Sequence, residues 1–234
     1  MLALATAALD LLFPAVCPLC SSRLGHGRRD PVCGTCWASF TRLSPPFCAG
    51  CGVPVPSDAI ARCALCRDTA PPFDYARAAA SYGGTVRDAV HALKFGGRRS
   101  LARPLGDLIV EHCAGVLDAP DGFVPVPLAR ARERERGFNQ AGLLAERVGE
   151  RLGVRVRPRW LVRLRATAAQ SDLAAAERRA NVAAAFAAAS AVAGREVVVI
   201  DDVMTTGATV GECARALRAA GARRVGVLAV ARVL

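Results

Sequence analysis

The spacing of the cysteines constrains this chain more than any other feature. Two residues separate the members of each of four C-x-x-C pairs, and 12, 11 and 11 residues separate successive pairs. A gap of two residues directs both thiolates to one tetrahedral metal, so four pairs supply ligands for two all-cysteine sites. We therefore predict two structural Zn(II) sites, with the ligands Cys17, Cys20, Cys33, Cys36, Cys48, Cys51, Cys63 and Cys66.

Metal binding would also explain how the cysteine-rich segment folds. Residues 15–70 contain few large apolar side chains, so the metals would supply folding free energy that a small core cannot. The pairs can combine sequentially or interleave, and the SPPF stretch at 44–47 favours sequential pairing because it divides the block in two. There are two alternatives to zinc binding: disulfide bonds, which are disfavoured, and redox-active C-x-x-C pairs.

Two apolar stretches bear on membrane insertion. Residues 1–16 are apolar, but Asp10 and Pro14 interrupt them, and they lack the basic leader and cleavage site of a signal peptide. Residues 183–193 are alanine-rich and too few to cross a bilayer. We expect a short N-terminal helix that packs on the protein, no membrane insertion and a cytoplasmic location.

The rest of the chain alternates between strand and helix patterns. Prolines within 69–76 mark a boundary between residues 1–70, an N-terminal helix with two zinc ribbons, and residues 71–234, an α/β domain. Strands separated by helices predict a parallel sheet flanked by helices. Cys113 and Cys213 lie in apolar helical patterns, and we predict buried thiols there. The predicted strands are 77–83, 122–128, 195–200 and 223–233, and the predicted helices are 85–95, 100–113, 139–153 and 208–221.

The stretch VVVIDDVMTTGAT at 197–209 carries the strongest signal for a binding site. Its aliphatic start predicts a strand buried on both faces, and ligands of such sheets bind beyond the carboxyl ends of the strands, where Asp201 and Asp202 would lie. The loop from Thr205 to Thr209 leads into a helix whose N-terminus can bind an anion. The carboxylates can accept hydrogen bonds from vicinal hydroxyls, and the loop beside them can hold a phosphate. This combination suits a sugar phosphate. A Walker A loop and a G-x-G-x-x-G motif are both missing.

Positive charge is concentrated in one part of the chain. The formal net charge is +11, and residues 121–165 contain 11 basic and 5 acidic residues. Lys94 is the single lysine, so phosphate contacts would come mostly from arginines, whose planar guanidinium groups suit oxyanions. A solvated, arginine-rich surface is the alternative explanation.

Four stretches together resemble one family. The 197–209 stretch resembles the phosphoribosyl pyrophosphate (PRPP) signature of type I phosphoribosyltransferases. With three other stretches it is similar to the ComF family, whose members join a zinc ribbon to a phosphoribosyltransferase-like domain. These stretches are PVPLARARERERGFNQA (125–141), RLRATAAQSDLAAAERRANVAAAF (163–186) and the C-x-x-C array. The resemblance implies a type I phosphoribosyltransferase-like fold and a role in natural transformation, on the cytoplasmic side with the DNA-uptake machinery.

The resemblance also implies roles for individual residues. Asp201 and Asp202 would bind the ribose hydroxyls and act as the catalytic pair, while the loop would hold the 5′-phosphate. The PRPP-binding residues would be Asp201, Asp202, Val203, Met204, Thr205, Thr206, Gly207, Ala208 and Thr209. A pyrophosphate loop, with Mg(II) bound to PRPP, would contain Arg130, Arg132, Arg136 and Gly137, and a flap would contain Arg165, Gln170 and Arg178. The alternative to the pyrophosphate loop is the basic start of a helix, with Glu133 and Glu135 as salt-bridge partners. The alternative to the flap is an exposed polar helix.

The sequence leaves the acceptor of such a transfer open. The donor half of the site is present, but only the zinc module or residues 71–100, which include His91 and Lys94, could cover the sugar. Three functions fit. The first is a PRPP-binding protein that handles single-stranded DNA, and the second is a phosphoribosyltransferase with a metabolic, purine-like acceptor. The third is a zinc-ribbon scaffold that docks a DNA-uptake helicase beside a vestigial pocket.

Overall fold

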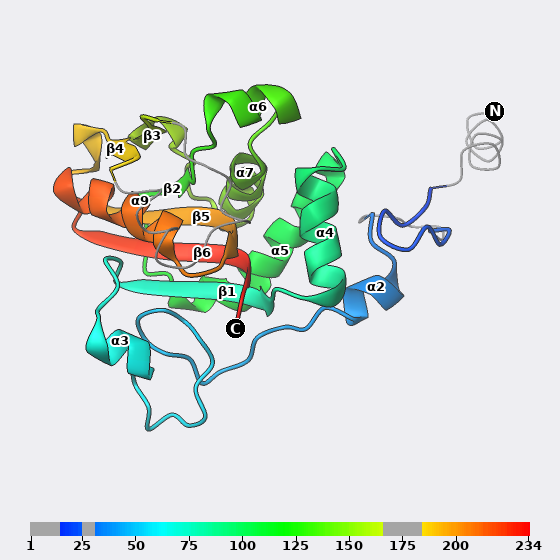
Figure 1. Ribbon diagram of the computed structural model, residues 1–234, viewed down its shortest axis with the longest axis horizontal. Coiled ribbons are helices and arrows are strands. Elements are labelled where there is room, and N and C mark those ends of the chain that lie inside the picture. Colours follow the sequence, from blue (N-terminus) through cyan, green and yellow to red (C-terminus); the bar gives the residue numbers. More distant parts are fainter. Residues whose placement is uncertain (1–14, 25–30, 166–183) are drawn as a thin grey trace.

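The computed structural model describes residues 15–24, 31–165 and 184–234, so most of the expected N-terminal helix lies outside the described residues (Figure 1). At its centre is a four-stranded sheet in the order β1, β6, β5, β2, with every neighbouring pair parallel. The predicted parallel α/β sheet is therefore confirmed. The strands are β1 (Tyr75–Ser81), β2 (Gly122–Pro125), β5 (Glu196–Met204) and β6 (Arg224–Arg232).

Two layers cover the sheet, one on each face (Figure 1). Val198 and Ile200 of β5 belong to the core cluster on one face, whereas Val197 and Val199 belong to the cluster on the other. Side chains of a strand alternate between faces, so the aliphatic run is buried on both, as predicted. The first face packs against α4 (Gly84–Lys94), α5 (Ala102–Cys113) and α7 (Gln140–Leu152), and the second against α9 (Ala208–Ala219) and the antiparallel pair β3 (Leu161–Arg163) and β4 (Phe186–Ala188).

The remaining elements of the described residues are short. Cys113 in α5 and Cys213 in α9 are buried, as predicted. Among the described residues, none of the helices combines the length and apolar composition needed to span a bilayer. The short elements are α2 (Gly34–Ala38), α3 (Ala64–Asp68), α6 (Arg130–Arg136) and the 3₁₀ turns Arg99–Leu101, Ala114–Val116, Pro158–Trp160 and Ser190–Val192.

Two strands end three or more residues away from their predicted ends. The predicted strand 195–200 ended before the acids, but β5 continues to Met204 because it stays in register with β6, with Asp201 opposite Ala229. β2 stops at Pro125, well before residue 128, because prolines have no N–H with which to extend the ladder. The acid pair is therefore held by a central strand and not by a loop.

The two cysteine groups lie in different places: the first precedes and enters α2, and the second precedes and enters α3 at the edge of β1 (Figure 1). The Ala76 N–H donates to the Gly50 carbonyl oxygen at 2.8 Å. Arg232 Nη1 of β6 donates to the Cys51 carbonyl oxygen at 2.5 Å. Gly52 has a φ of +71°, and a Cβ there would lie 2.1 Å from the Ala76 carbonyl oxygen. Only glycine allows this close approach between the second cysteine group and the sheet.

The segment between the cysteine groups pairs with β1. The Leu43 N–H donates to the Ala79 carbonyl oxygen at 2.9 Å, in an antiparallel arrangement. The Ser81 N–H donates to the Thr41 carbonyl oxygen at 2.8 Å. Phe40 and Leu43 are buried in the core clusters of the two faces. Part of the cysteine-rich segment therefore contributes to the core of the α/β fold.

Candidate functional site

A cavity of about 1170 Å³ lies at the carboxyl ends of the strands. Because the four strands are parallel, these ends meet at one edge of the sheet, where ligands of such sheets bind. Each strand contributes to the cavity wall. Tyr82 follows β1, Val126 follows β2, Asp202 lies in β5 and Val233 follows β6.

Asp201 and Asp202 both line the cavity, and both are buried. Since side chains alternate along a strand, Asp202 shares its face of the sheet with Ile200, below α4, and Asp201 shares the opposite face with Val199, below α9. The Asp202 N–H donates to Asp201 Oδ1 at 2.8 Å. The two carboxyl groups thus reach the cavity from opposite faces of β5.

Lys94, the last residue of α4, provides the counter-charge for Asp202. The Lys94 Nζ lies 2.8 Å from Asp202 Oδ1, and the two side chains are 20% and 4% exposed. The other oxygen, Asp202 Oδ2, is buried, and no group among the described residues donates a hydrogen bond to it. A buried acceptor without a donor, at the wall of a polar cavity, is available to a ligand hydroxyl.

Burial and the ion pair shift the protonation of this cluster. Burial alone would lower the pKa of Lys94, but the charge of Asp202 and its hydrogen bond outweigh burial and raise that pKa. Burial, followed by the charge of Asp202, raises the pKa of Asp201, although the charge of Lys94 opposes the shift. The site favours a proton on Asp201 beside a Lys94–Asp202 ion pair.

The loop after β5 leads directly into α9. Gly207 is the N-cap of α9 and has a φ of +75°, a conformation that favours glycine. The Ala208 N–H donates to Thr206 Oγ1 at 3.3 Å. Thr205 and Thr209 line the cavity, so the positive end of this 12-residue helix lies beside it. This helix end can bind an anion in the cavity.

Only part of the predicted PRPP stretch faces the cavity. The Met204 side chain is buried in the core on the α9 face, and Thr206, Gly207 and Ala208, where the loop enters α9, do not line the cavity. These four residues therefore do not contribute to the cavity wall. The residues that line the cavity are Asp201, Asp202, Val203, Thr205 and Thr209.

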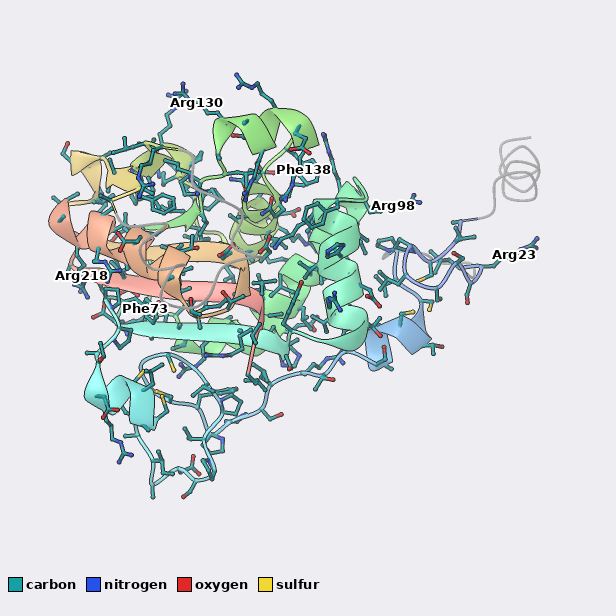
Figure 2. The ribbon with its side chains drawn as sticks, in the orientation of Figure 1. Arg23, Phe73, Arg98, Arg130, Phe138 and Arg218 are labelled. Carbon is teal, nitrogen blue, oxygen red and sulfur yellow. The ribbon has the colours of Figure 1, made fainter. Side chains whose placement is uncertain are left out.

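The predicted pyrophosphate loop is the helix α6 followed by a glycine. The helical alternative that the sequence left open therefore describes its backbone correctly. Arg132 and Arg136 line the cavity, and Arg136 Nη1 donates to Gln140 Oε1 at 2.8 Å. Arg130 is exposed and extends from the outer surface (Figure 2). Gly137 ends α6 with a φ of +73°.

Arg163 adds a third arginine to the cavity wall, and the sequence prediction missed it. Its Nη1 donates to the Pro127 carbonyl oxygen at 3.5 Å. The signal was its place at the start of a family-like stretch, but the prediction assigned the flap to later residues. Arg165 is exposed and does not line the cavity. Gln170 and Arg178 lie outside the described residues.

An aromatic wall, also missed from the sequence, is formed by Tyr82, His91, Phe95 and Phe138. The ring centroids of His91 and Phe95 are 4.6 Å apart, and the Arg136 guanidinium lies 4.7 Å from the Phe95 ring centroid. Phe138 lies below α6, on the side that faces α4 (Figure 2). Phe95 is nevertheless 63% exposed. Residues 71–100, which include His91 and Lys94, were one of two segments that could cover the sugar, and this wall lies partly within them.

The cysteines form two sequential groups, each with its four sulfur atoms within 4.8 Å of one another. The sequence favoured this pairing over interleaving. Both groups contain the same backbone contact, in which an N–H donates to a sulfur at 3.4 Å, from Cys33 to Cys17 and from Cys63 to Cys48. Four sulfur donors at this spacing fit a tetrahedral Zn(II) ion. The groups are Cys17, Cys20, Cys33 and Cys36, and Cys48, Cys51, Cys63 and Cys66.

Two family models match the chain. The double zinc ribbon domain matches residues 8–70, and the phosphoribosyl transferase domain matches residues 136–233. The first match includes both cysteine groups. The second includes β5, α9 and β6, which carry the acid pair and the threonine loop.

Curated relatives match nearly the whole chain. DNA utilization protein YhgH of Escherichia coli is 35% identical over 229 residues, which is 96% of this chain and 100% of that protein. Competence protein F of Haemophilus influenzae is 29% identical over 92% of this chain and 96% of its own length. Competence protein ComFC of Bacillus subtilis is 28% identical over 80% of this chain and 78% of its own length. The chain therefore belongs to the ComF family, in which a double zinc ribbon precedes a phosphoribosyl transferase domain.

Proposed function

We propose that the cavity binds PRPP together with Mg(II), and that the protein uses this site while it handles single-stranded DNA in the cytoplasm during natural transformation. The observation that carries the proposal is one cavity shared by three kinds of group. These are the acid pair, the threonines at the start of α9, and the arginines Arg132, Arg136 and Arg163. Each kind suits a different part of PRPP.

The acid pair suits the ribose. Asp202 Oδ2 is a buried acceptor that lacks a donor among the described residues, and a ribose hydroxyl would satisfy it. Burial raises the pKa of Asp201, so this carboxyl group can donate a hydrogen bond as well as accept one. Vicinal hydroxyls, each both donor and acceptor, match such a pair.

The helix end and the arginines suit the phosphates. The 5′-phosphate would bind at the N-terminus of α9, next to Thr205 and Thr209. The diphosphate would lie against Arg132 and Arg136, because guanidinium groups bind phosphate oxygens in bidentate pairs. Mg(II), when bound, would screen the charge of the diphosphate.

The proposed role with DNA is supported by the names of the relatives and by charge. Proteins named for DNA utilization and for competence match most of the chain, and the formal net charge is +11. Contacts between arginines and DNA phosphates release counterions, so the affinity for single-stranded DNA should fall steeply with salt. Aromatic residues make up only 5% of the chain, so base stacking should add little sequence preference.

A second candidate function is transfer of the phosphoribosyl group to an acceptor. The aromatic wall favours it, because a planar base could stack on an exposed ring such as Phe95. Release of pyrophosphate from PRPP, measured over acceptors that include purine bases and single-stranded DNA, would separate transfer from binding alone. A scaffold that docks a DNA-uptake helicase needs neither the acid pair nor the arginines of the cavity.

Calorimetric titration of PRPP with Mg(II) tests the proposal. We expect Asp202→Asn and Arg132→Ala each to weaken PRPP binding by about 10- to 100-fold, because hydrogen bonds to charged groups contribute about 1.5–3 kcal/mol. Arg130→Ala is the matched control. It makes the same charge change in the same helix, but Arg130 is exposed and outside the cavity wall, so its affinity should stay within about twofold of wild type.

Two outcomes of this titration would contradict the proposal: no binding of PRPP by the wild type, or equal affinities in the Arg130 and Arg132 variants. Repeating the titration with single-stranded DNA present tests the second half of the proposal. An effect of DNA on PRPP affinity, or joint binding of both ligands, is expected. If DNA does not change the PRPP affinity and the protein binds no DNA at low salt, the proposed role with DNA is wrong and only the proposed PRPP site stands.

A further inference from the structure

Lys94 is unusual both in its identity and in its place. It is the single lysine among 31 basic residues. It ends α4, a helix that Val90 and Leu93 anchor in the core beneath it. Its Nζ contacts Asp202 Oδ1 at 2.8 Å, and its side chain lines the cavity. The fold therefore delivers one ammonium group to the acid pair.

Without Lys94, the Asp202 carboxylate would suit a divalent cation. Magnesium and manganese ions prefer carboxylate and hydroxyl oxygens, and Asp201, Asp202 and Thr205 line the same cavity. Asp202 Oδ2 has no hydrogen-bond donor among the described residues. The ammonium group of Lys94 contacts the other oxygen, Asp202 Oδ1, and its positive charge would repel a divalent cation at this short distance.

We propose that Lys94 keeps Asp202 from binding a divalent cation until an anionic ligand enters the cavity, and that Lys94 then releases Asp202. The inference rests on the proposed function, since PRPP is the anionic ligand concerned. Lys94 is a positioning residue in this scheme. In the free protein it neutralises Asp202, and in the complex its ammonium group contacts phosphate oxygens of the ligand.

The chemistry of lysine supports such an exchange. An ammonium group is a compact charge on a flexible stem, with three donors that can turn from one acceptor to another, whereas an arginine would bind the carboxylate in a fixed bidentate pair. The second position for the ammonium group lies close by. Arg136, which would hold the diphosphate, stacks 4.7 Å from the ring of Phe95, the residue next to Lys94.

The test uses Mn(II) alone, so it does not require PRPP. The full chain, loaded with zinc, is titrated with Mn(II), and the electron paramagnetic resonance signal of free Mn(II) gives the bound fraction. We expect Lys94→Gln to bind Mn(II) at least about tenfold more tightly than wild type, because the variant removes the charge beside Asp202. The gain should disappear in Lys94→Gln/Asp202→Asn.

Two controls separate the contact from the net charge. Arg98→Gln makes the same charge change near the same end of α4, but Arg98 is exposed and outside the cavity wall, so wild-type Mn(II) affinity is expected (Figure 2). Lys94→Arg keeps the charge and should keep Mn(II) binding weak. Circular dichroism checks the fold of each variant, and Lys94→Met replaces Lys94→Gln if the latter does not fold.

Equal Mn(II) affinity in Lys94→Gln and wild type would overturn the inference, as would a gain that persists after Asp202→Asn. The two proposals can fail separately. If the protein binds no PRPP, the Mn(II) titration still reports on Lys94 and Asp202. If PRPP binds but Lys94→Gln gains no Mn(II) affinity, the proposed function stands and the role of Lys94 does not.

Discussion

Asp201 and Asp202 are neighbours in sequence but have different surroundings. Asp202 has Lys94 as its counter-ion, whereas Asp201 lies on the other face of β5 without an ion pair among the described residues. The acids themselves could be predicted, because an aliphatic run that ends in two acids is a local pattern. Their different surroundings could not, since α4 and β5 are far apart in the chain and the contact depends on the tertiary fold.

The buried Asp201 should make stability depend on pH. Burial raises the pKa of Asp201 in the folded protein, whereas the pKa of an aspartate in the unfolded chain is about 4. Above about pH 4 unfolding releases a proton, so stability falls as pH rises toward the folded-state pKa, by up to about 1.4 kcal/mol per pH unit. We expect Asp201→Asn to remove this part of the decline. Urea unfolding at several pH values measures it.

Asp118→Asn is the control for the pH series, because Asp118 is 86% exposed and lies away from the cavity. Comparing each variant with wild type at the same pH cancels the titration of the cysteine groups. If wild type and Asp201→Asn show parallel pH profiles, Asp201 does not hold a proton in the folded state.

At the scale of elements, local patterns predicted some segments well and others poorly. α7 and α9 have an apolar face and end beside glycines, and their bounds agree with the predictions to within two residues. α6 has the sequence RARERER and no apolar face, so periodicity could not identify it. β5 extends past its aliphatic run because pairing with β6 continues, which is a tertiary effect.

The two cysteine groups should differ in their effect on stability. We expect Cys17→Ser and Cys48→Ser each to lose one of two zinc ions, as measured by elemental analysis. Cys48→Ser should lower the melting temperature more, by at least about 5 °C relative to Cys17→Ser, because the second group contacts β1 and β6 through Gly50 and Cys51. Equal losses would show that these contacts add nothing, and absence of zinc from wild type would refute the metal sites.

At the scale of the whole molecule, the cavity combines segments that the chain order keeps apart. The rule for parallel sheets predicted the edge at which the cavity lies, and the acid pair forms part of its wall. The sequence could not predict that Arg163 and the aromatic wall line the same cavity, because they belong to different elements that only the tertiary fold brings together. The pairing of residues 41–43 with β1 was also beyond the sequence pattern, since so short a segment carries no periodicity.

The location of bound PRPP tests the account most directly. Hydrogen–deuterium exchange is measured on the full chain with and without PRPP and Mg(II). The account predicts slower exchange of backbone amides in residues 126–140 and 201–209, around the cavity, and unchanged exchange at the opposite ends of the strands, in residues 118–122 and 221–224. Slower exchange confined to those opposite ends or to the cysteine groups would contradict it.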